Sequence, residues 1–345
     1  MKEPKNNKLR IIFAGSPAIA LPSLEKAAGL AKAGRIVLAG ILTNQDKHKG
    51  RGGGAMPSDV GCRAALLAEE FVSLGLSAPA ILKFETLKAE AREAVSALKP
   101  DLLVSFAYGR IFGPQFLSLF PMGGINIHPS LLPKYRGASP IQETILQRDS
   151  VTGICIQLTG AEMDSGNILA WEKIFLTGRE TTASLGSISA IKGAELLAGV
   201  LEQFEGPLIP KGTPQEGEPS YCRVLEKKSG LINWNKSAAE IDAQIRACNP
   251  WPLAYTSHNG QTVIIHEAAP YSGTEAPGTG CSGAGGGVLG IDKKSGILIQ
   301  TGDGVLAVSL LQYQHRKVLP WQAFLNGARD FIGSRLIQYN TIGGS

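Results

Sequence analysis

The sequence has little of what several classes of protein require. Its 345 residues include five cysteines and five histidines, and only 6% of them are aromatic. The cysteines are far apart and none forms a CxxC pair, which argues against a disulfide framework and a structural zinc site. No apolar run reaches the roughly 18 residues of a membrane helix, and the polar, basic first ten residues do not resemble a signal peptide. We therefore expect a cytoplasmic protein with reduced thiols, no metal and no membrane association.

The amino-acid composition is that of a folded protein with a large hydrophobic core. Hydrophobic residues make up 43% and charged residues 18% of the chain, which excludes a mainly disordered protein. At roughly 100–200 residues per domain, this length predicts about two domains. The net charge of +5 allows an anionic partner without requiring one.

The apolar pattern changes character after residue 204. Before it, short apolar runs alternate with segments of helical spacing, which predicts a parallel sheet covered by helices. Segment 205–222 contains four prolines and is interpreted as a linker. Beyond it, short runs separated by glycine turns predict a smaller β-barrel with one or two helices. The expected domains are therefore 1–204 and 223–345.

The expected elements can be given by residue range. In the first domain, strands are expected at 9–14, 36–43, 102–107, 125–128, 153–158 and 168–175, and helices at 19–33, 60–74, 87–98 and 182–204. In the second, strands are expected at 231–234, 254–257, 262–268, 288–291, 296–301 and 304–311, and helices at 238–248 and 320–329.

Residues 124–140 carry the densest signal for chemistry. Asn126 and His128 are two positions apart on an expected strand, so their side chains point to the same side. They lie at the carboxyl end of the strand, where ligands bind in open α/β sheets. The alternative, a buried core histidine beside a turn asparagine, is less favoured because the two polar groups share a face before a loop rich in proline and glycine.

A second signal is Asp164, followed by Ser165 and Gly166 between two expected strands. An aspartate before Ser-Gly is a common turn former, so spacing alone leaves a catalytic role less favoured than a structural one.

These motifs resemble a known family. Asn126-x-His128, the run Ser130-Leu131-Leu132-Pro133 and the pair Asp164-x-Gly166 are similar to motifs of the 10-formyltetrahydrofolate-dependent formyltransferases. Within that family the chain looks most like the enzymes that act on methionyl-tRNA. The similarity extends from about Leu9 to about Leu336 and is most specific over residues 126–141.

The resemblance implies a fold and a reaction. The fold would be α/β, with a Rossmann-like N-terminal catalytic domain and a smaller OB-like β-barrel that binds tRNA. The reaction would transfer the formyl group of 10-formyltetrahydrofolate to the free amino group of initiator methionyl-tRNA, which gives N-formylmethionyl-tRNA for translation initiation. No metal and no stable protein partner would be needed, and a monomer is expected.

The resemblance also implies roles for particular residues. Asn126 and a protonated His128 would stabilise the oxyanion formed on the formyl carbon, and Asp164 would orient and charge the histidine. Folate binding would use six residues: Arg110, Ile111, Ser130, Leu131, Leu132 and Pro133. Binding of tRNA would use Lys47, Lys49 and Arg51, in a loop that lacks the proline and the later basic pair usual in the family.

Two other functions remain as alternatives. A formyltransferase acting on a nucleotide-linked amino sugar would share the same Asn, His and Asp set. A non-catalytic RNA-binding protein on a similar scaffold would leave Asn126, His128 and Asp164 unexplained. The Gly50-Arg51-Gly52 loop favours tRNA as the acceptor.

Overall fold

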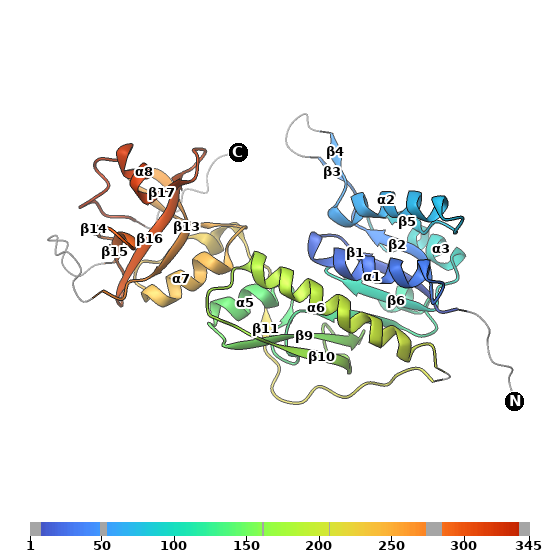
Figure 1. Cartoon of the computed structure of the whole chain (residues 1–345). Coiled ribbons are helices and arrows are strands. Elements are labelled where there is room, and N and C mark those ends of the chain that lie inside the picture. The colour runs from blue at the N-terminus through green and yellow to red at the C-terminus, as the bar shows by residue number, and fades with distance from the viewer. Residues whose placement is uncertain (1–7, 49–53, 161, 207, 274–284, 338–345) are drawn as a thin grey trace, which may run out of the picture. The chain divides into compact units, whose positions relative to one another are not determined.

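The chain divides into two compact units (Figure 1). The computed structural model describes residues 8–48, 54–160, 162–206, 208–273 and 285–337. The first unit comprises Met1–Pro140, Val151–Phe175 and Gly186–Cys222, and the second comprises Ile141–Ser150, Leu176–Leu185 and Arg223–Ser345. The segment expected to be a linker, 205–222, thus packs with the first unit, and two short segments before residue 204 pack with the second.

A seven-stranded sheet forms the centre of the first unit. Its strands are β1 (Arg10–Gly15), β2 (Val37–Thr43), β5 (Ala80–Lys83), β6 (Leu102–Phe106), β7 (Gly124–His128), β9 (Val151–Leu158) and β10 (Ile168–Phe175). They lie in the order β10-β9-β7-β6-β1-β2-β5. Strands β1, β2, β5, β6 and β7 run parallel, β9 is antiparallel to β7, and β10 is antiparallel to β9. The predicted α/β fold with a parallel sheet is confirmed.

Helices cover both faces of this sheet, because its strands are apolar on both sides. The helical segments up to residue 203 are η1 (Ala18–Ala20), α1 (Leu21–Lys32), α2 (Asp59–Ser73), α3 (Ala89–Ala97), α4 (Pro114–Leu117), α5 (Pro140–Leu146) and α6 (Thr182–Gln203). Ile11 and Phe13 of β1 pack in one cluster with α1, α2 and α6, whereas Ile12 and Ala14 pack in another with α3 and α4. This alternation places successive side chains on opposite faces.

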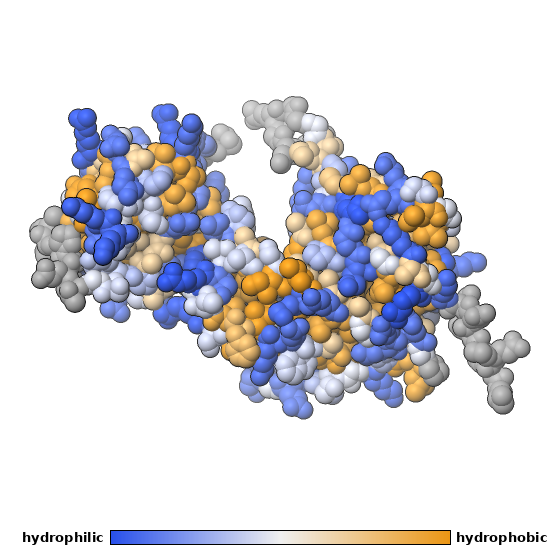
Figure 2. Space-filling view, in the orientation of Figure 1, coloured by the Kyte–Doolittle hydropathy of each residue, from blue (hydrophilic) through white to orange (hydrophobic). Residues whose placement is uncertain are grey.

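Helix α6 is apolar enough to resemble a membrane segment. Among the described helices it alone has the length and hydropathy to span a bilayer, and 44% of its most apolar window is buried. Its Leu197, Val200 and Leu201 belong to the core on one face of the sheet. Figure 2 shows hydrophobic surface over α6, where Ile188 and Ile191 are exposed. Its high hydropathy follows from packing on the sheet.

The second unit contains an antiparallel sheet of six strands. The strands are β12 (Ala254–His258), β13 (Gln261–Pro270), β14 (Val288–Asp292), β15 (Gly296–Gln300), β16 (Val305–Tyr313) and β17 (Leu319–Pro320), in the order β12-β13-β16-β15-β14 with β17 beside β16. Residues 334–337 link its two edges: Ile337 exchanges backbone hydrogen bonds with Ser257 of β12, and Leu336 donates to Gly286 before β14. This linkage is the antiparallel, barrel-like arrangement that the glycine-punctuated runs predict.

In residues 223–337 of the second unit, the described helical segments are α7 (Ala238–Ala247), α8 (Trp321–Asn326) and η2 (Lys227–Gly230), and residues 141–146 of α5 belong to the same unit. A reciprocal capping box of Ser237 and Glu240 begins α7, whose Ile241 and Ile245 are fully buried in the core. The strand expected at 231–234 is wrong: only Leu231 makes a bridge, to Tyr255, before the chain turns into α7.

Candidate active site

Strand β7 presents two polar side chains on one face. Ile125 and Ile127 point into the core shared with α6, so Asn126 and His128 point to the opposite face. Both lie at the carboxyl end of β7, beside β6. His128 is 4% exposed and therefore lies beneath the surface of the site.

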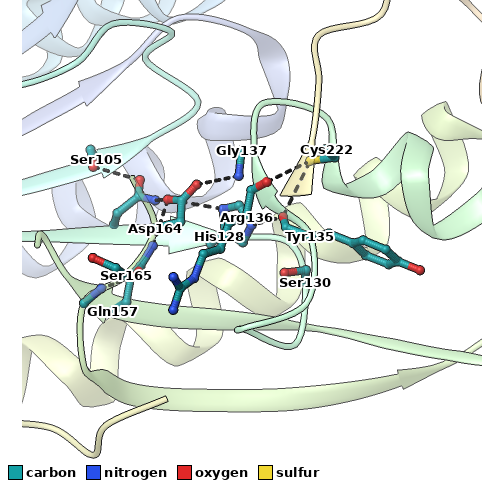
Figure 3. A network of polar contacts seen from close by, with 12 residues as sticks. Ser105, His128, Ser130, Tyr135, Arg136, Gly137, Gln157, Asp164, Ser165 and Cys222 are labelled. Carbon is teal, nitrogen blue, oxygen red and sulfur yellow. Dashed lines mark hydrogen bonds and ion pairs between the residues drawn. The ribbon is translucent and has the colours of Figure 1, made fainter. Parts of the chain in front are cut away.

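Asp164 approaches these residues from the turn between β9 and β10. Its Oδ1 lies 3.6 Å from His128 Nδ1 and accepts hydrogen bonds from Asn126 Nδ2 (3.3 Å) and Gln157 Nε2 (2.9 Å). Its Oδ2 accepts from the backbone N–H of Gly137 at 2.9 Å (Figure 3). The structure thus brings together three side chains that lie up to 38 residues apart in the sequence.

The ring of His128 has a defined tautomer. Nε2 lies 2.9 Å from the carbonyl oxygen of Tyr135, and a carbonyl oxygen only accepts, so Nε2 carries the hydrogen. The lone pair of Nδ1 then faces Asp164. Burial lowers the pKa of His128, although Asp164 and the Tyr135 carbonyl act in the opposite direction. Burial thus disfavours the imidazolium, whereas the carboxylate favours it, and the protonated His128 expected from the sequence stays a prediction.

Ser105 on β6 fixes the orientation of the Asn126 amide. Its hydroxyl donates to Asn126 Oδ1 at 2.9 Å, so that Nδ2 is the end directed at Asp164 (Figure 3). Gln157 on β9 pairs with Asn126 in the strand register and is 1% exposed. The sequence analysis did not identify either residue. Gln157 could have been identified, because a glutamine inside an apolar strand is buried and a buried amide needs hydrogen-bond partners.

The residues predicted to bind folate form two groups. Ser130, Leu131, Leu132 and Pro133 lie in the loop after β7, where Leu131 covers Gly153 of β9. Leu131 and Leu132 line a cavity of about 540 Å³, together with residues of β9, β10 and segment 213–216.

The second group follows β6. The guanidinium of Arg110 donates to the carbonyl oxygen of Phe84 at 2.8 Å and also to that of Glu85, and Ile111 is 78% exposed. Because β6 and β9 flank β7 on opposite sides, the two groups lie on either side of Asn126 and His128. The side chain of Arg110 is held by the backbone after β5, so a role in binding would fall to its backbone.

The residues predicted to bind tRNA are only partly described. Lys47 is exposed in β3 (Lys47–His48), which pairs with β4 (Ala55–Met56) in a hairpin that extends from the first unit (Figure 1). Lys49 and Arg51 lie outside the described residues. Within the described part of the chain, no three His, Cys, Asp or Glu side chains gather as a metal site would require.

Comparison with known proteins identifies the family. Residues 10–201 match the formyl transferase family and residues 224–329 match its C-terminal domain. A methionyl-tRNA formyltransferase of Treponema denticola is 44% identical over 326 residues, 94% of this chain and 98% of that protein. One from Treponema pallidum is 38% identical over 337 residues, 95% of this chain and 99% of that protein.

A solved structure shares the fold. The N-formyltransferase from Helicobacter canadensis, in complex with folinic acid and dTDP-3-aminofucose, superimposes with a TM-score of 0.57 at 19% identity, covering 87% of this chain and 98% of that one. The two family matches and the nearly full-length relatives agree with the convergence of Asn126, His128 and Asp164. The chain belongs to the formyltransferase family.

Proposed function

We propose that the protein transfers the formyl group of 10-formyltetrahydrofolate to the amino group of initiator methionyl-tRNA. The product, N-formylmethionyl-tRNA, serves translation initiation. Two relatives that are methionyl-tRNA formyltransferases over nearly the whole chain support this acceptor. The observation that carries the chemistry is the carboxylate of Asp164 seated between the amide of Asn126 and the imidazole of His128.

The reaction needs three things from the protein. The neutral amine attacks the formyl carbon and must lose a proton, an oxyanion forms, and the N10 nitrogen of the folate takes up a proton as it leaves. Asn126 Nδ2 has two hydrogens, of which one is used by Asp164. The second is available to the oxyanion, and an amide oriented in advance by Ser105 provides this stabilisation without reorganisation.

Proton transfer falls to His128 and Asp164. Nδ1 is the ring atom that the backbone does not occupy, so it takes the proton that the amine loses and returns it to the leaving nitrogen. Asp164 stabilises the imidazolium while it exists, at an Nδ1 to Oδ1 distance of 3.6 Å. No covalent enzyme intermediate is needed. Cys155 lies opposite His128 in the strand register, but burial raises its pKa to about 11, which keeps the thiol protonated.

The co-substrate is of folate type. The Helicobacter canadensis enzyme, which shares the fold, was solved with folinic acid. The exposed Ile111 and the backbone of Arg110 would contact the folate on one side of the catalytic residues. The loop of Ser130, Leu131, Leu132 and Pro133 would shape the other side.

The acceptor would be held electrostatically. Lys47 lies on the exposed hairpin, and Lys49 and Arg51 belong to the same loop in the sequence. Basic groups on such a loop attract phosphates, and the net charge of +5 acts in the same direction. The protein would act as a cytoplasmic monomer, with residues 1–204 as the catalytic domain, 205–222 as the connection and 223–345 as the tRNA-binding domain.

A transfer assay tests the function. Purified protein receives 10-formyltetrahydrofolate and either methionyl-tRNA or a nucleotide-linked amino sugar as acceptor. We expect formylation of methionyl-tRNA, and a preference for the amino sugar would establish the alternative acceptor. Asn126→Ala, His128→Ala and Asp164→Ala should each lower kcat by about 10²–10³, since each removes a group that acts in the transition state. The control is His315→Asn, which replaces an exposed histidine of the second unit and should leave both folding and activity unchanged. Near-normal transfer by all three variants would contradict the assignment.

A further inference from the structure

A side chain from segment 205–222 enters the catalytic network. We propose that Gln215 is a positioning residue for formyl transfer: its carboxamide joins the turn that carries Asp164 to the loop that carries Arg136. This inference rests on the proposed function, because the reaction that it positions is the formyl transfer argued above.

Both ends of the Gln215 carboxamide are occupied. Nε2 donates to the carbonyl oxygens of Asp164 and Gly166, each at 2.8 Å. Oε1 accepts from Arg136, from Nε at 3.1 Å and from Nη2 at 2.6 Å. An amide has two donor hydrogens and a two-lone-pair oxygen, so this arrangement uses its full capacity. A glutamine is required because the two carbonyls need a donor and the guanidinium needs an acceptor.

The two loops that Gln215 joins are those that place Asp164 against His128. One is the turn of Asp164, whose backbone has a φ of 52°, a conformation that needs support in a non-glycine residue. The other is the loop of Gly137, whose N–H donates to Asp164 Oδ2, and of Tyr135, whose carbonyl holds His128 Nε2. Gln215 thus ties together the two loops that position the carboxylate and the imidazole.

The chain on both sides of Gln215 is anchored to the same two loops. Thr213 and Ile168 exchange two backbone hydrogen bonds of 2.8 Å, at the start of β10. After Gln215, β11 (Tyr221–Cys222) pairs in parallel with β8 (Arg136–Gly137), and the Arg136 N–H donates to the Ser220 carbonyl at 2.8 Å. The Ser139 N–H donates to the sulfur of Cys222 at 3.3 Å. Segment 211–222 is therefore a clamp over the catalytic loops, and Gln215 is one of its inward-facing residues.

The turn is coupled to the catalytic carboxylate by close packing against β9 and by the hydrogen bonds of Gln157. A Cβ added to Gly166 would lie 1.6 Å from the carbonyl oxygen of Leu158. The Gly166 N–H donates to Gln157 Oε1 at 3.2 Å, and Gln157 Nε2 in turn binds Asp164. Loss of the Gln215 hydrogen bonds would therefore shift the Asp164 carboxylate relative to His128.

The test compares two substitutions with a matched control in the full-length protein. Gln215→Leu removes both halves of the contact. Gln215→Glu keeps an acceptor for Arg136 but turns an oxygen toward two carbonyl oxygens. Gln203→Leu, an exposed position at the end of α6, is the control. We expect kcat to fall by roughly 10- to 100-fold in both Gln215 variants, since a displacement of about 1 Å costs up to that factor. The KM for methionyl-tRNA should stay within roughly twofold, because the loss concerns the transition state.

Two kinetic outcomes would overturn the inference. A raised KM at unchanged kcat would make Gln215 a substrate-binding contact. Wild-type rates for Gln215→Glu would show that the Nε2 bonds to the turn position nothing.

A second measurement separates this inference from the proposed function. Hydrogen exchange at the amides of Ser165 and Gly166 should be faster in both Gln215 variants than in the wild type and in Gln203→Leu. Unchanged exchange would overturn the positioning role. If the wild-type protein transfers no formyl group, the proposed function fails, and the exchange measurement then decides by itself whether Gln215 holds the turn.

Discussion

At His128 two electrostatic effects oppose each other. Burial disfavours the imidazolium, while the carboxylate of Asp164 favours it. The balance depends on how well the carboxylate is satisfied by other groups. Asp164 accepts hydrogen bonds from Asn126, Gln157 and Gly137, so it is stable without a cationic neighbour. In its neutral form, His128 has an Nδ1 lone pair that can accept a proton from the substrate, and Asp164 stabilises the imidazolium that results.

The lowered pKa of His128 predicts a pH dependence of stability. The unfolded chain has a histidine pKa of about 6.5 and the folded chain a lower one, so between these values the unfolded state binds more protons. The contribution of His128 to stability is therefore complete above about pH 6.5 and is lost as the pH falls through the folded value. Relative to His128→Gln, the wild type should lose thermal stability between pH 7 and pH 5, measured as the unfolding midpoint.

The control for this measurement is an exposed histidine. His315→Asn has an exposed side chain, and its backbone φ of 65° is one that asparagine tolerates, so this variant should follow the wild-type dependence. A wild-type midpoint that rises relative to His128→Gln on acidification would show that the folded protein prefers the imidazolium.

The sequence predicted these residues to different extents. The shared face of Asn126 and His128 follows from their spacing of two on a strand, which is local information. Asp164 depends on the turn between β9 and β10 and on the pairing of β9 with β7, so spacing alone could not place it beside His128. Gln215 lies in a segment of proline and glycine, and such composition says nothing about what the segment packs against.

At the scale of elements, prediction followed periodicity. The strand expected at 168–175 matches β10, and the helix expected at 182–204 ends one residue after α6, because both have long and regular apolar patterns. Strands β8 and β11 have two residues each, and they pair only because the clamp lies over the catalytic loop. Such pairing depends on tertiary structure, which leaves no periodic signal.

Two of the glycines in helix α6, Gly193 and Gly199, have opposite surroundings. A Cβ at Gly199 would meet nothing within 4 Å, whereas a Cβ at Gly193 would lie 2.9 Å from Ile154 Cδ1 and 3.0 Å from Ile127 Cγ2. Gly199→Ala should raise the free energy of unfolding by about 0.5–1 kcal/mol through helix propensity. At Gly193 that gain is opposed by overpacking of about 1–3 kcal/mol against β7 and β9.

Denaturant unfolding of the two variants checks this prediction. Each serves as the control of the other, because substitution and helix are the same. Gly193→Ala should be less stable than Gly199→Ala and should also lower formyl transfer, since Ile127 lies between Asn126 and His128. Equal stability of the two variants would contradict this prediction, because it would mean that Ile127 and Ile154 accommodate the added methyl group without a loss of free energy of unfolding.

At the scale of the whole molecule, the two compact units are not continuous stretches of the sequence. Segments 141–150 and 176–185 pack with the second unit although they precede residue 204, and 205–222 packs with the first. A fragment that ends at residue 204 would therefore lack the clamp of segment 211–222, including Gln215. The proline-rich composition of segment 205–222 predicted a domain boundary there. Which residues belong to one compact unit is instead decided by contacts between residues that lie far apart in the sequence.

Charge is the other property that belongs to the whole molecule. A net charge of +5 attracts a polyanion over long range, and the exposed Lys47 on the β3–β4 hairpin adds to this attraction locally. Each phosphate contact that is lost should lower the slope of log K against log salt by about 0.7–0.9. Lys47→Ala should therefore weaken methionyl-tRNA binding and flatten its salt dependence by about one such contact, measured by equilibrium binding at several salt concentrations. Lys26→Ala, at an exposed position of α1, should leave the slope unchanged. If the slope for Lys47→Ala equals that of the wild type, Lys47 makes no phosphate contact and the prediction that this hairpin binds tRNA is contradicted.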